Sequence, residues 1–154
     1  MITTFLFDIG GVFFEADWEK INQYIYQKTG VPIFPLNGGR YDFYVDFSLG
    51  EITINDYFKR LRKEVNSTAQ ISSLKKAYKK AYTTYAPIDK EMLKLIVSLH
   101  TNYFIACVTN TNRFHEKINQ ERGLFKEFDK KFTSYKYGAL RRIRIFFQNS
   151  PQTR

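Results

Sequence analysis

Two short apolar segments, far apart in the sequence, constrain the fold of this chain more than any other feature. Residues 4–8, TFLFD, and residues 103–108, YFIACV, each have the length and composition of a buried strand. Polar or glycine residues follow each segment at once, and a segment with helical spacing of its apolar positions comes next. Buried strands that alternate with helices are typical of a parallel sheet. We therefore predict an α/β fold built on a three-layer, Rossmann-like parallel sheet, with a third short strand near residues 128–133.

The chain between the two strands is predicted to be mostly helical. Asp17 occupies an N-cap position, Gly30 a helix end, and Thr53 with Asp56 resembles a capping box. Further helices are expected over residues 41–49, 72–85, 89–99 and, after the second strand, 113–122. The segment between the strands is too long for a single crossover, and this predicts a helical cap inserted at the carboxyl edge of the sheet. Residues 1–15 and 100–154 would form the core, and residues 16–99 the cap.

Asp8 and Thr109 stand at the carboxyl ends of the two predicted strands, where open α/β sheets bind their ligands. A carboxylate at this edge can act as a nucleophile or as a ligand of Mg²⁺. Gly10 and Gly11 allow a metal or an anion to approach the backbone closely, and Asn110 adds an amide and a backbone N–H. Each residue alone could simply cap a turn or a helix. The pair together favours a binding site.

The order of these motifs resembles that of the haloacid dehalogenase-like (HAD) hydrolase superfamily. The first motif of that family, D-x-D-G-T/V or in some branches D-x-G-G/N-V, resembles residues 8–12, DIGGV. The second, a buried strand that ends in Ser or Thr and is often followed by Asn, resembles residues 107–112, CVTNTN. A stretch of the family's cap resembles residues 47–52, FSLGEI. Beyond the second motif the similarity continues, to about residue 140, through Gly123-Leu124, Phe128-Asp129, Ser134 and Gly138.

The resemblance implies a cytoplasmic phosphatase that acts on a small phosphorylated metabolite. Asp8 would attack phosphorus, form an aspartyl-phosphate and bind Mg²⁺ together with the backbone carbonyl of Gly10. Thr109 would hold the phosphoryl oxygens, with Gly10, Gly11 and Asn110 also contacting the substrate. Dehalogenation is not favoured, because that branch of the family usually has Tyr where Gly10 stands. The aromatic residues of the cap would shape the substrate pocket; they are Tyr24, Tyr41, Phe43, Tyr44 and Phe47.

Three departures from the family pattern bear on activity. Gly10 replaces the second Asp, the general acid/base of most of these phosphatases. The lysine of the third motif falls at Arg141 and the proline at Arg142; Arg141 could bring positive charge to Asp8, but the alternative is a solvated basic tail. The acidic fourth motif is absent, since no acidic residue follows Asp129. We therefore expect an incomplete sheet and weakly held Mg²⁺.

The basic tail, residues 139–154, leads to two alternative hypotheses. Some codon choices for it would encode, in another frame, a sequence close to the expected third motif, so the tail could be a frameshift product and the chain a truncated, weakly active or inactive relative. The tail could also belong to a basic nucleic-acid-associated module, because the net charge is +9. Residues 126–154 carry eight basic and two acidic residues, so that +6 of the +9 lies there and the rest is only mildly basic. We therefore do not expect a nucleic-acid partner, and the sequence does not indicate the oligomeric state.

The remaining signals concern location and metals. The single cysteine, Cys107, fits a reducing cytoplasm and is expected in the core. The sequence has no apolar run near 18 residues and no signal-peptide pattern, so no membrane partner is predicted. His100 and His115 have no partners at zinc-ligand spacing. His115 is expected on the surface of a helix, with a place in the pocket as the alternative.

Overall fold

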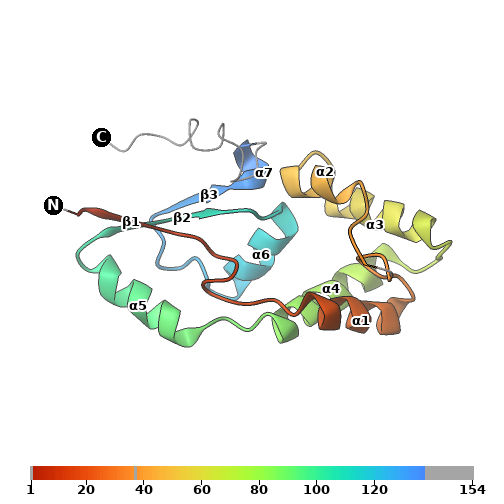
Figure 1. Cartoon of the computed structure of the whole chain (residues 1–154), viewed down its shortest axis with the longest axis horizontal. Coiled ribbons are helices and arrows are strands. Elements are labelled where there is room, and N and C mark those ends of the chain that lie inside the picture. Colours follow the sequence, from red (N-terminus) through yellow and green to blue (C-terminus); the bar gives the residue numbers. More distant parts are fainter. Residues whose placement is uncertain (1, 37, 138–154) are drawn as a thin grey trace. The chain divides into compact units, whose positions relative to one another are not determined.

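The computed structural model describes residues 2–36 and 38–137 (Figure 1). The chain forms two compact units. Unit 1 takes its described residues from the first 15 positions, from Ser48–Glu51 and from the chain after Pro87, and unit 2 consists of Ala16–Phe47 and Ile52–Pro87. Arg141 and the rest of the predicted basic tail lie outside the described residues. The assignment of residues 16–99 to a cap stays a prediction.

Unit 1 contains a parallel sheet of three strands in the order β1 (Thr4–Phe7), β2 (Phe104–Thr109) and β3 (Lys130–Thr133). The helices α5 (Lys90–His100) and α6 (Arg113–Glu121) lie on one side of this sheet, and the short α7 (Ser134–Tyr137) follows β3 (Figure 1). The structure thus confirms the predicted α/β class with a parallel sheet.

The core of unit 1 lies between the sheet and its helices. Asp89 caps α5 by accepting hydrogen bonds from the backbone N–H groups of Glu91 and Met92, and Ile96 on this helix is buried. The buried residues of this core are Ile9, Phe13, Ile96, Ile105, Cys107, Leu124 and Phe125. Cys107 is in the core, as expected, and burial raises the pKa of its thiol to about 12. A thiolate nucleophile at this position is therefore not favoured.

The first strand differs from the prediction of a buried segment. Along β1 the side chains alternate between exposed and half-buried, and Leu6 is 56% exposed. The physical reason is that β1 is the edge strand of the sheet in the described part of the chain, and successive side chains of a strand point to opposite faces. Only Phe5 and Phe7 pack against the core.

Unit 2 is helical, with α1 (Trp18–Thr29), α3 (Ile54–Glu64) and α4 (Ile71–Tyr85), and with the first residues of α2 (Tyr44–Leu49). Its predicted helix signals are confirmed. Asp17 accepts from the backbone N–H of Lys20 at 3.0 Å, Gly30 ends α1 with φ +69°, and the Thr53–Asp56 capping box is present. The inward face of α4 consists of Leu74, Ala77, Tyr78, Ala81 and Tyr82, which are all buried.

Aromatic side chains form much of the packing in unit 2. Tyr57 is buried, and its hydroxyl donates to the Ile33 carbonyl at 2.9 Å. The ring of Phe47 stacks on that of Tyr57 with 4.5 Å between their centroids. Phe47, predicted to shape a substrate pocket, is thus a core residue, because its ring is covered by its neighbours. In the described part of the chain, no helix is both long and apolar enough to cross a membrane.

Candidate functional site

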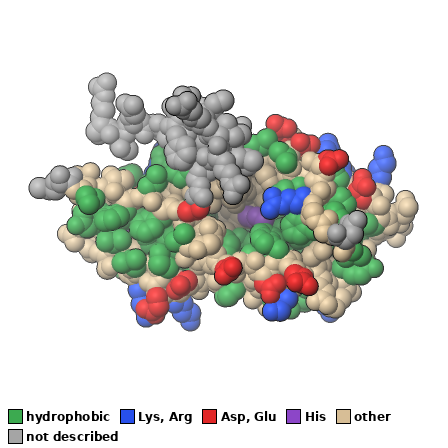
Figure 2. All heavy atoms as spheres, viewed as in Figure 1, with side chains coloured by type: hydrophobic (Ala, Val, Ile, Leu, Met, Phe, Trp, Pro, Cys, Tyr) green, Lys and Arg blue, Asp and Glu red, His purple; other side chains and the backbone are tan. Residues whose placement is uncertain are grey.

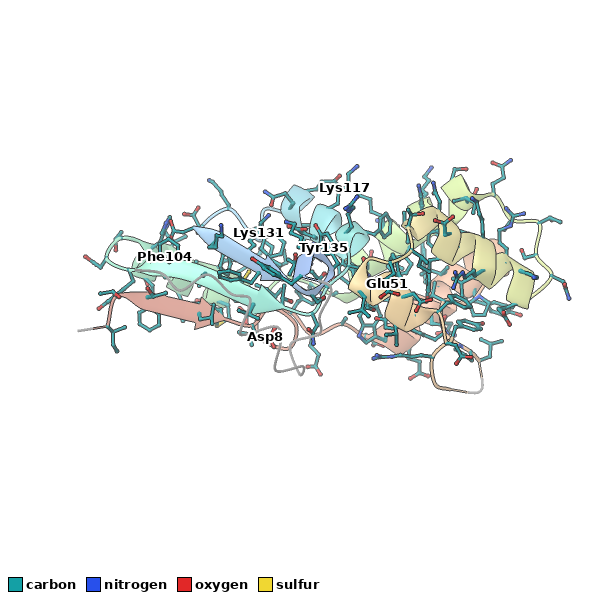
Figure 3. The ribbon with its side chains drawn as sticks, turned by 90° about the horizontal axis from the view of Figure 1, so that it is seen from above. Asp8, Glu51, Phe104, Lys117, Lys131 and Tyr135 are labelled. Atoms are coloured by element: carbon teal, nitrogen blue, oxygen red, sulfur yellow. The ribbon has the colours of Figure 1, made fainter. Side chains whose placement is uncertain are left out.

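The first element of the candidate site is the loop that follows β1. Asp8 stands at the end of the strand, where its carboxylate Oδ1 accepts from the backbone N–H of Ile9 at 2.8 Å (Figure 3). Ile9 and Phe13 are buried in the core of unit 1 and anchor the loop. The backbone N–H of Phe13 donates to the Ile9 carbonyl at 2.9 Å, and that of Gly11 to the Phe14 carbonyl at 2.9 Å. These bonds make a tight turn, and Asp8 at the start of this turn is half-buried.

The two glycines of this loop meet different requirements. Gly11 has φ +78°, a left-handed conformation that L side chains rarely adopt. Gly10 has no positive φ, and a Cβ built on it would have no neighbouring atom within 4 Å. The turn therefore favours glycine at position 11, whereas at position 10 a Cβ atom meets no neighbour.

The second element is the end of β2. Phe7 is paired with Cys107 across the parallel strands. In the same register Asp8 follows opposite Val108, and Thr109 is the next residue of β2. Neighbouring strands are about 4.8 Å apart, so Asp8 and Thr109 come from the same edge of adjacent strands. Thr109 is buried and Asn110 exposed. The fold thus brings together the two ends that the sequence predicted, and the roles assigned to these residues stay predictions.

The loop between β2 and α6 is held by a buried serine. The hydroxyl of Ser134, at the start of α7, accepts from the backbone N–H of Thr111 at 3.0 Å and lies 2.8 Å from the Thr111 carbonyl oxygen. At the end of the same loop, the Asn112 side chain caps α6 by accepting from the backbone N–H of His115 at 2.9 Å. Both ends of the loop are therefore fixed by side-chain hydrogen bonds.

His115 is not on the surface, and the prediction for it was wrong. The residue is buried in the first turn of α6, and the Nδ2 atom of Asn112 lies 3.2 Å from its Nδ1. Burial lowers the pKa of the imidazole to about 3, so the ring is neutral at pH 7. A signal for this was available: His115, Ile118 and Asn119 recur at i, i+3 and i+4, the spacing of a buried helix face.

Sequence reasoning also missed a buried carboxylate on α6. Glu116 accepts hydrogen bonds from the Tyr135 hydroxyl and from Lys136 Nζ at 3.1 Å, and Lys131 Nζ lies 3.2 Å away (Lys131 and Tyr135 are labelled in Figure 3). Burial by itself would raise the pKa of Glu116, but these hydrogen bonds outweigh it and leave that pKa below its usual value. No local pattern identifies such a cluster, because its members come from α6, β3 and α7.

Another buried polar group lies beside Thr109. Thr133, at the end of β3, is the residue paired with Thr109 across the strands. Its side chain is fully buried, and the hydroxyl has no hydrogen-bond partner among the residues that the structure describes. The hydroxyl adds a polar atom to the carboxyl edge of the sheet at a cost in stability.

The oxygen atoms at this edge fit the chemistry of Mg²⁺ only in part. The Asp8 carboxylate and the Gly10 carbonyl are hard oxygen donors of the kind that Mg²⁺ prefers. Over residues 2–36 and 38–137, no three His, Cys, Asp or Glu side chains gather into a group that could hold a metal. Mg²⁺ commonly keeps several waters and binds through one or two carboxylates and a substrate phosphate. These donors therefore suit a weakly held ion.

Comparison with solved structures identifies the fold. An enzyme of the HAD family from Bacteroides thetaiotaomicron, in complex with magnesium and inorganic phosphate, superposes with a TM-score of 0.77 and 19% identity over 96% of this chain and 76% of that one. A predicted HAD-like family hydrolase from Porphyromonas gingivalis gives 0.76 and 20% over 96% and 74%. The HAD-hydrolase YfnB from Bacillus subtilis, bound to magnesium, gives 0.55 and 19% over 98% and 75%. No family model and no curated protein sequence matches the chain.

The chain therefore has the fold of the HAD-like hydrolases, as its motifs had predicted. At these low identities the likeness establishes the fold and leaves the chemistry to be argued from the site itself.

Proposed function

We propose that the chain is a Mg²⁺-dependent phosphatase that hydrolyses a small phosphorylated metabolite through an aspartyl-phosphate. The observation that carries this proposal is the placement of Asp8 and Thr109 at the carboxyl edge of adjacent parallel strands. Support comes from the fold, since the similar enzyme from Bacteroides thetaiotaomicron was solved with magnesium and inorganic phosphate.

The proposed reaction has two steps. The Asp8 carboxylate attacks phosphorus, and the bond from phosphorus to the leaving oxygen breaks, so that the phosphoryl group is carried by Asp8. Water then attacks the aspartyl-phosphate, which releases inorganic phosphate and restores the carboxylate. The Thr109 hydroxyl and the backbone N–H of Asn110 would bind the phosphoryl oxygens, where negative charge develops.

Mg²⁺ would be held by the Asp8 carboxylate and the Gly10 carbonyl. When bound, it would supply positive charge that offsets the charge of the phosphoryl group. The Ile9 N–H orients the Asp8 carboxylate, and the hydrogen bonds of Gly11 and Phe13 shape the turn that carries Gly10.

Gly10 implies a preference among substrates. A positioned general acid typically contributes about 10²–10⁴-fold, and Gly10 supplies none to the leaving oxygen. We therefore expect phosphate esters of acidic alcohols, such as p-nitrophenyl phosphate, to react much faster than alkyl phosphates, because a good leaving group does not need to be protonated.

The nucleic-acid alternative receives no support from the face of the molecule shown in Figure 2. On the face shown in Figure 2, acidic and basic side chains are interspersed and do not gather into a basic patch. The basic tail on which that alternative depends lies outside the described residues.

Phosphate release by the purified chain, with and without Mg²⁺, tests the proposal. We expect release from p-nitrophenyl phosphate that requires Mg²⁺ and is abolished by Asp8→Asn, which removes the nucleophile while keeping the shape. Asp42→Asn, the same change at an exposed residue of unit 2, is the matched control and should leave the rate unchanged. Release that survives Asp8→Asn would overturn the mechanism, and no release at all would favour the inactive relative.

A further inference from the structure

A short segment of the predicted cap packs within unit 1. Ser48–Glu51 is surrounded in the sequence by residues of unit 2, but its contacts belong to the unit that carries the sheet. Gly50, with φ +81°, lies against the backbone of Tyr135; a Cβ built on it would be 3.1 Å from Tyr135 Cβ and 3.2 Å from the Tyr135 carbonyl oxygen. Figure 3 labels Tyr135 and Glu51, the residue after Gly50. Any larger residue at position 50 must therefore displace either its own segment or the backbone of Tyr135.

Tyr135 is not free to give way. Its hydroxyl donates to the buried Glu116 carboxylate. The Arg113 guanidinium lies 5.7 Å from the centre of its ring and Lys136 Nζ lies 5.6 Å from it. These contacts hold Tyr135 from both its hydroxyl and its ring, so strain at Gly50 is expected to reach the backbone at the start of α7.

The preceding residue, Ser134, contacts two segments at once. Its fully buried hydroxyl accepts from the Thr111 N–H, and two carbonyl oxygens compete for its proton: that of Thr111 at 2.8 Å and that of Ser48 at 3.4 Å. A hydroxyl has one proton and can serve only one of them well. The position of Ser48 therefore affects how firmly the loop after β2 is held.

We propose that the junction formed by Ser134 and Tyr135 couples segment Ser48–Glu51 to the loop of residues 109–112, and that Ser134 and Gly50 are positioning residues for that loop. The catalytic consequence rests on the proposed function, because the Thr109 hydroxyl and the Asn110 N–H at the start of this loop are the groups expected to bind the phosphoryl oxygens. The coupling itself is a property of the fold and can be measured without activity.

Amide hydrogen exchange at Thr111, followed by NMR in the full chain, tests the coupling. We expect Gly50→Ala to speed exchange at the Thr111 amide by about tenfold, the order of one lost hydrogen bond. Gly123→Ala is the matched control in the same unit, since Gly123 has φ +79° but open space around it. An unchanged Thr111 amide in a folded Gly50→Ala variant would overturn the proposal.

A second variant keeps the test decisive if Gly50→Ala does not fold. Tyr135→Phe removes only the hydroxyl that holds Tyr135 to Glu116, and we expect it to speed exchange at the Thr111 amide. Tyr103→Phe, in the same unit, is its control. An unchanged Thr111 amide in Tyr135→Phe would contradict the coupling.

Kinetics separate this proposal from the proposed function. Ser134→Ala should lower kcat for p-nitrophenyl phosphate by about tenfold with little change in KM, and Ser134→Thr, which keeps the hydroxyl, should restore most of it. Ser98→Ala, an exposed serine of α5, should have no effect. The effects of Gly50→Ala and Ser134→Ala on kcat/KM should be non-additive, and strict additivity would count against coupling. Coupled exchange without any phosphatase activity would refute the proposed function but not the junction.

Discussion

Gly10 and Gly11 are adjacent in the loop after β1, but only Gly11 has a backbone conformation that favours glycine. The open space at Gly10 means that its lack of a side chain is not demanded by packing. In the proposed reaction this position determines whether the leaving oxygen can receive a proton from the protein. The proton donor that position 10 lacks is therefore one of the three departures from the family pattern that bear on the proposed reaction.

We expect Gly10→Asp to raise kcat for an alkyl phosphate by about 10²-fold, because it adds a general acid near Asp8 at a position where a Cβ meets no neighbouring atom. The rate for p-nitrophenyl phosphate should rise less. Gly10→Asn, which has the same size but no transferable proton, is the control, and the measurement is phosphate release at saturating Mg²⁺. An equal gain in both variants would mean that the acid is not what the site lacks.

His115 should make the stability of the fold depend on pH. Its pKa is 6.5 when exposed and about 3 in the folded chain because of burial, so between these values the unfolded chain binds a proton that the folded chain does not. The contribution of the neutral His115 ring to the stability of the fold is therefore fully present above pH 6.5, and it is lost as the pH falls below that value. From pH 7 to pH 5 we expect a loss of about 2 kcal/mol in the free energy of unfolding.

Urea unfolding at the two pH values checks this, with His115→Gln expected to remove most of the difference. His100 provides the opposite case, because its hydrogen bond to Asp129 raises its pKa, and its contribution is present at low pH and lost as the pH rises. A pH dependence unchanged by His115→Gln would show that other groups cause it.

Thr133 carries a buried hydroxyl without a partner among the described residues. Thr133→Val keeps the shape and removes this group, so we expect the free energy of unfolding to rise by about 1 kcal/mol. Thr101→Val, at an exposed threonine whose hydroxyl donates to the Ser98 carbonyl, should give no gain. A loss of stability in Thr133→Val would indicate that water or another group satisfies the hydroxyl.

At the scale of elements, one carboxylate ties three of them together. Glu116 on α6 contacts Lys131 on β3 and both Tyr135 and Lys136 on α7. The side chain of Glu116 is only 10% exposed, so these bonds act with less solvent screening than pairs on the surface. This cluster fixes the start of α7, and with it the Ser134 hydroxyl that holds the loop after β2.

Glu116→Gln should lower the free energy of unfolding at pH 7 by about 2 kcal/mol, the order of a hydrogen-bond set to a charged group. Because the folded-state pKa of Glu116 is lowered, its contribution is present above the usual value of 4.5 and is lost as the pH falls below it. Glu91→Gln breaks the exposed pair with Lys94 and should cost almost nothing. Denaturant unfolding of the two variants makes the comparison, and equal effects would contradict the role given to Glu116.

At the scale of the whole molecule, ligand binding should raise the free energy of unfolding. If Mg²⁺ binds the folded chain through Asp8, an ion concentration ten times its dissociation constant should raise the free energy of unfolding by about 1.4 kcal/mol. Thermal unfolding with Mg²⁺ and with a chelator measures this shift, and Asp8→Asn should abolish it. A shift that persists in that variant would place the ion elsewhere.

The sequence by itself determined the three strands, the helices other than the short α7, and caps such as Asp17, Thr53 and Asp89. The spacing of apolar residues and caps such as Asp17 and Asp89 act among neighbours in the chain, so the pattern alone predicts them. It also placed Asp8 and Thr109 at strand ends, and hence at one edge of a parallel sheet.

Only the tertiary structure decided which of these residues are covered and what they contact. In the folded chain Leu6 is exposed and His115 is buried. Two lysines contact Glu116, and Gly50 lies against Tyr135. These outcomes depend on contacts between residues far apart in the sequence, where burial and hydrogen bonding are settled by packing and not by local propensity.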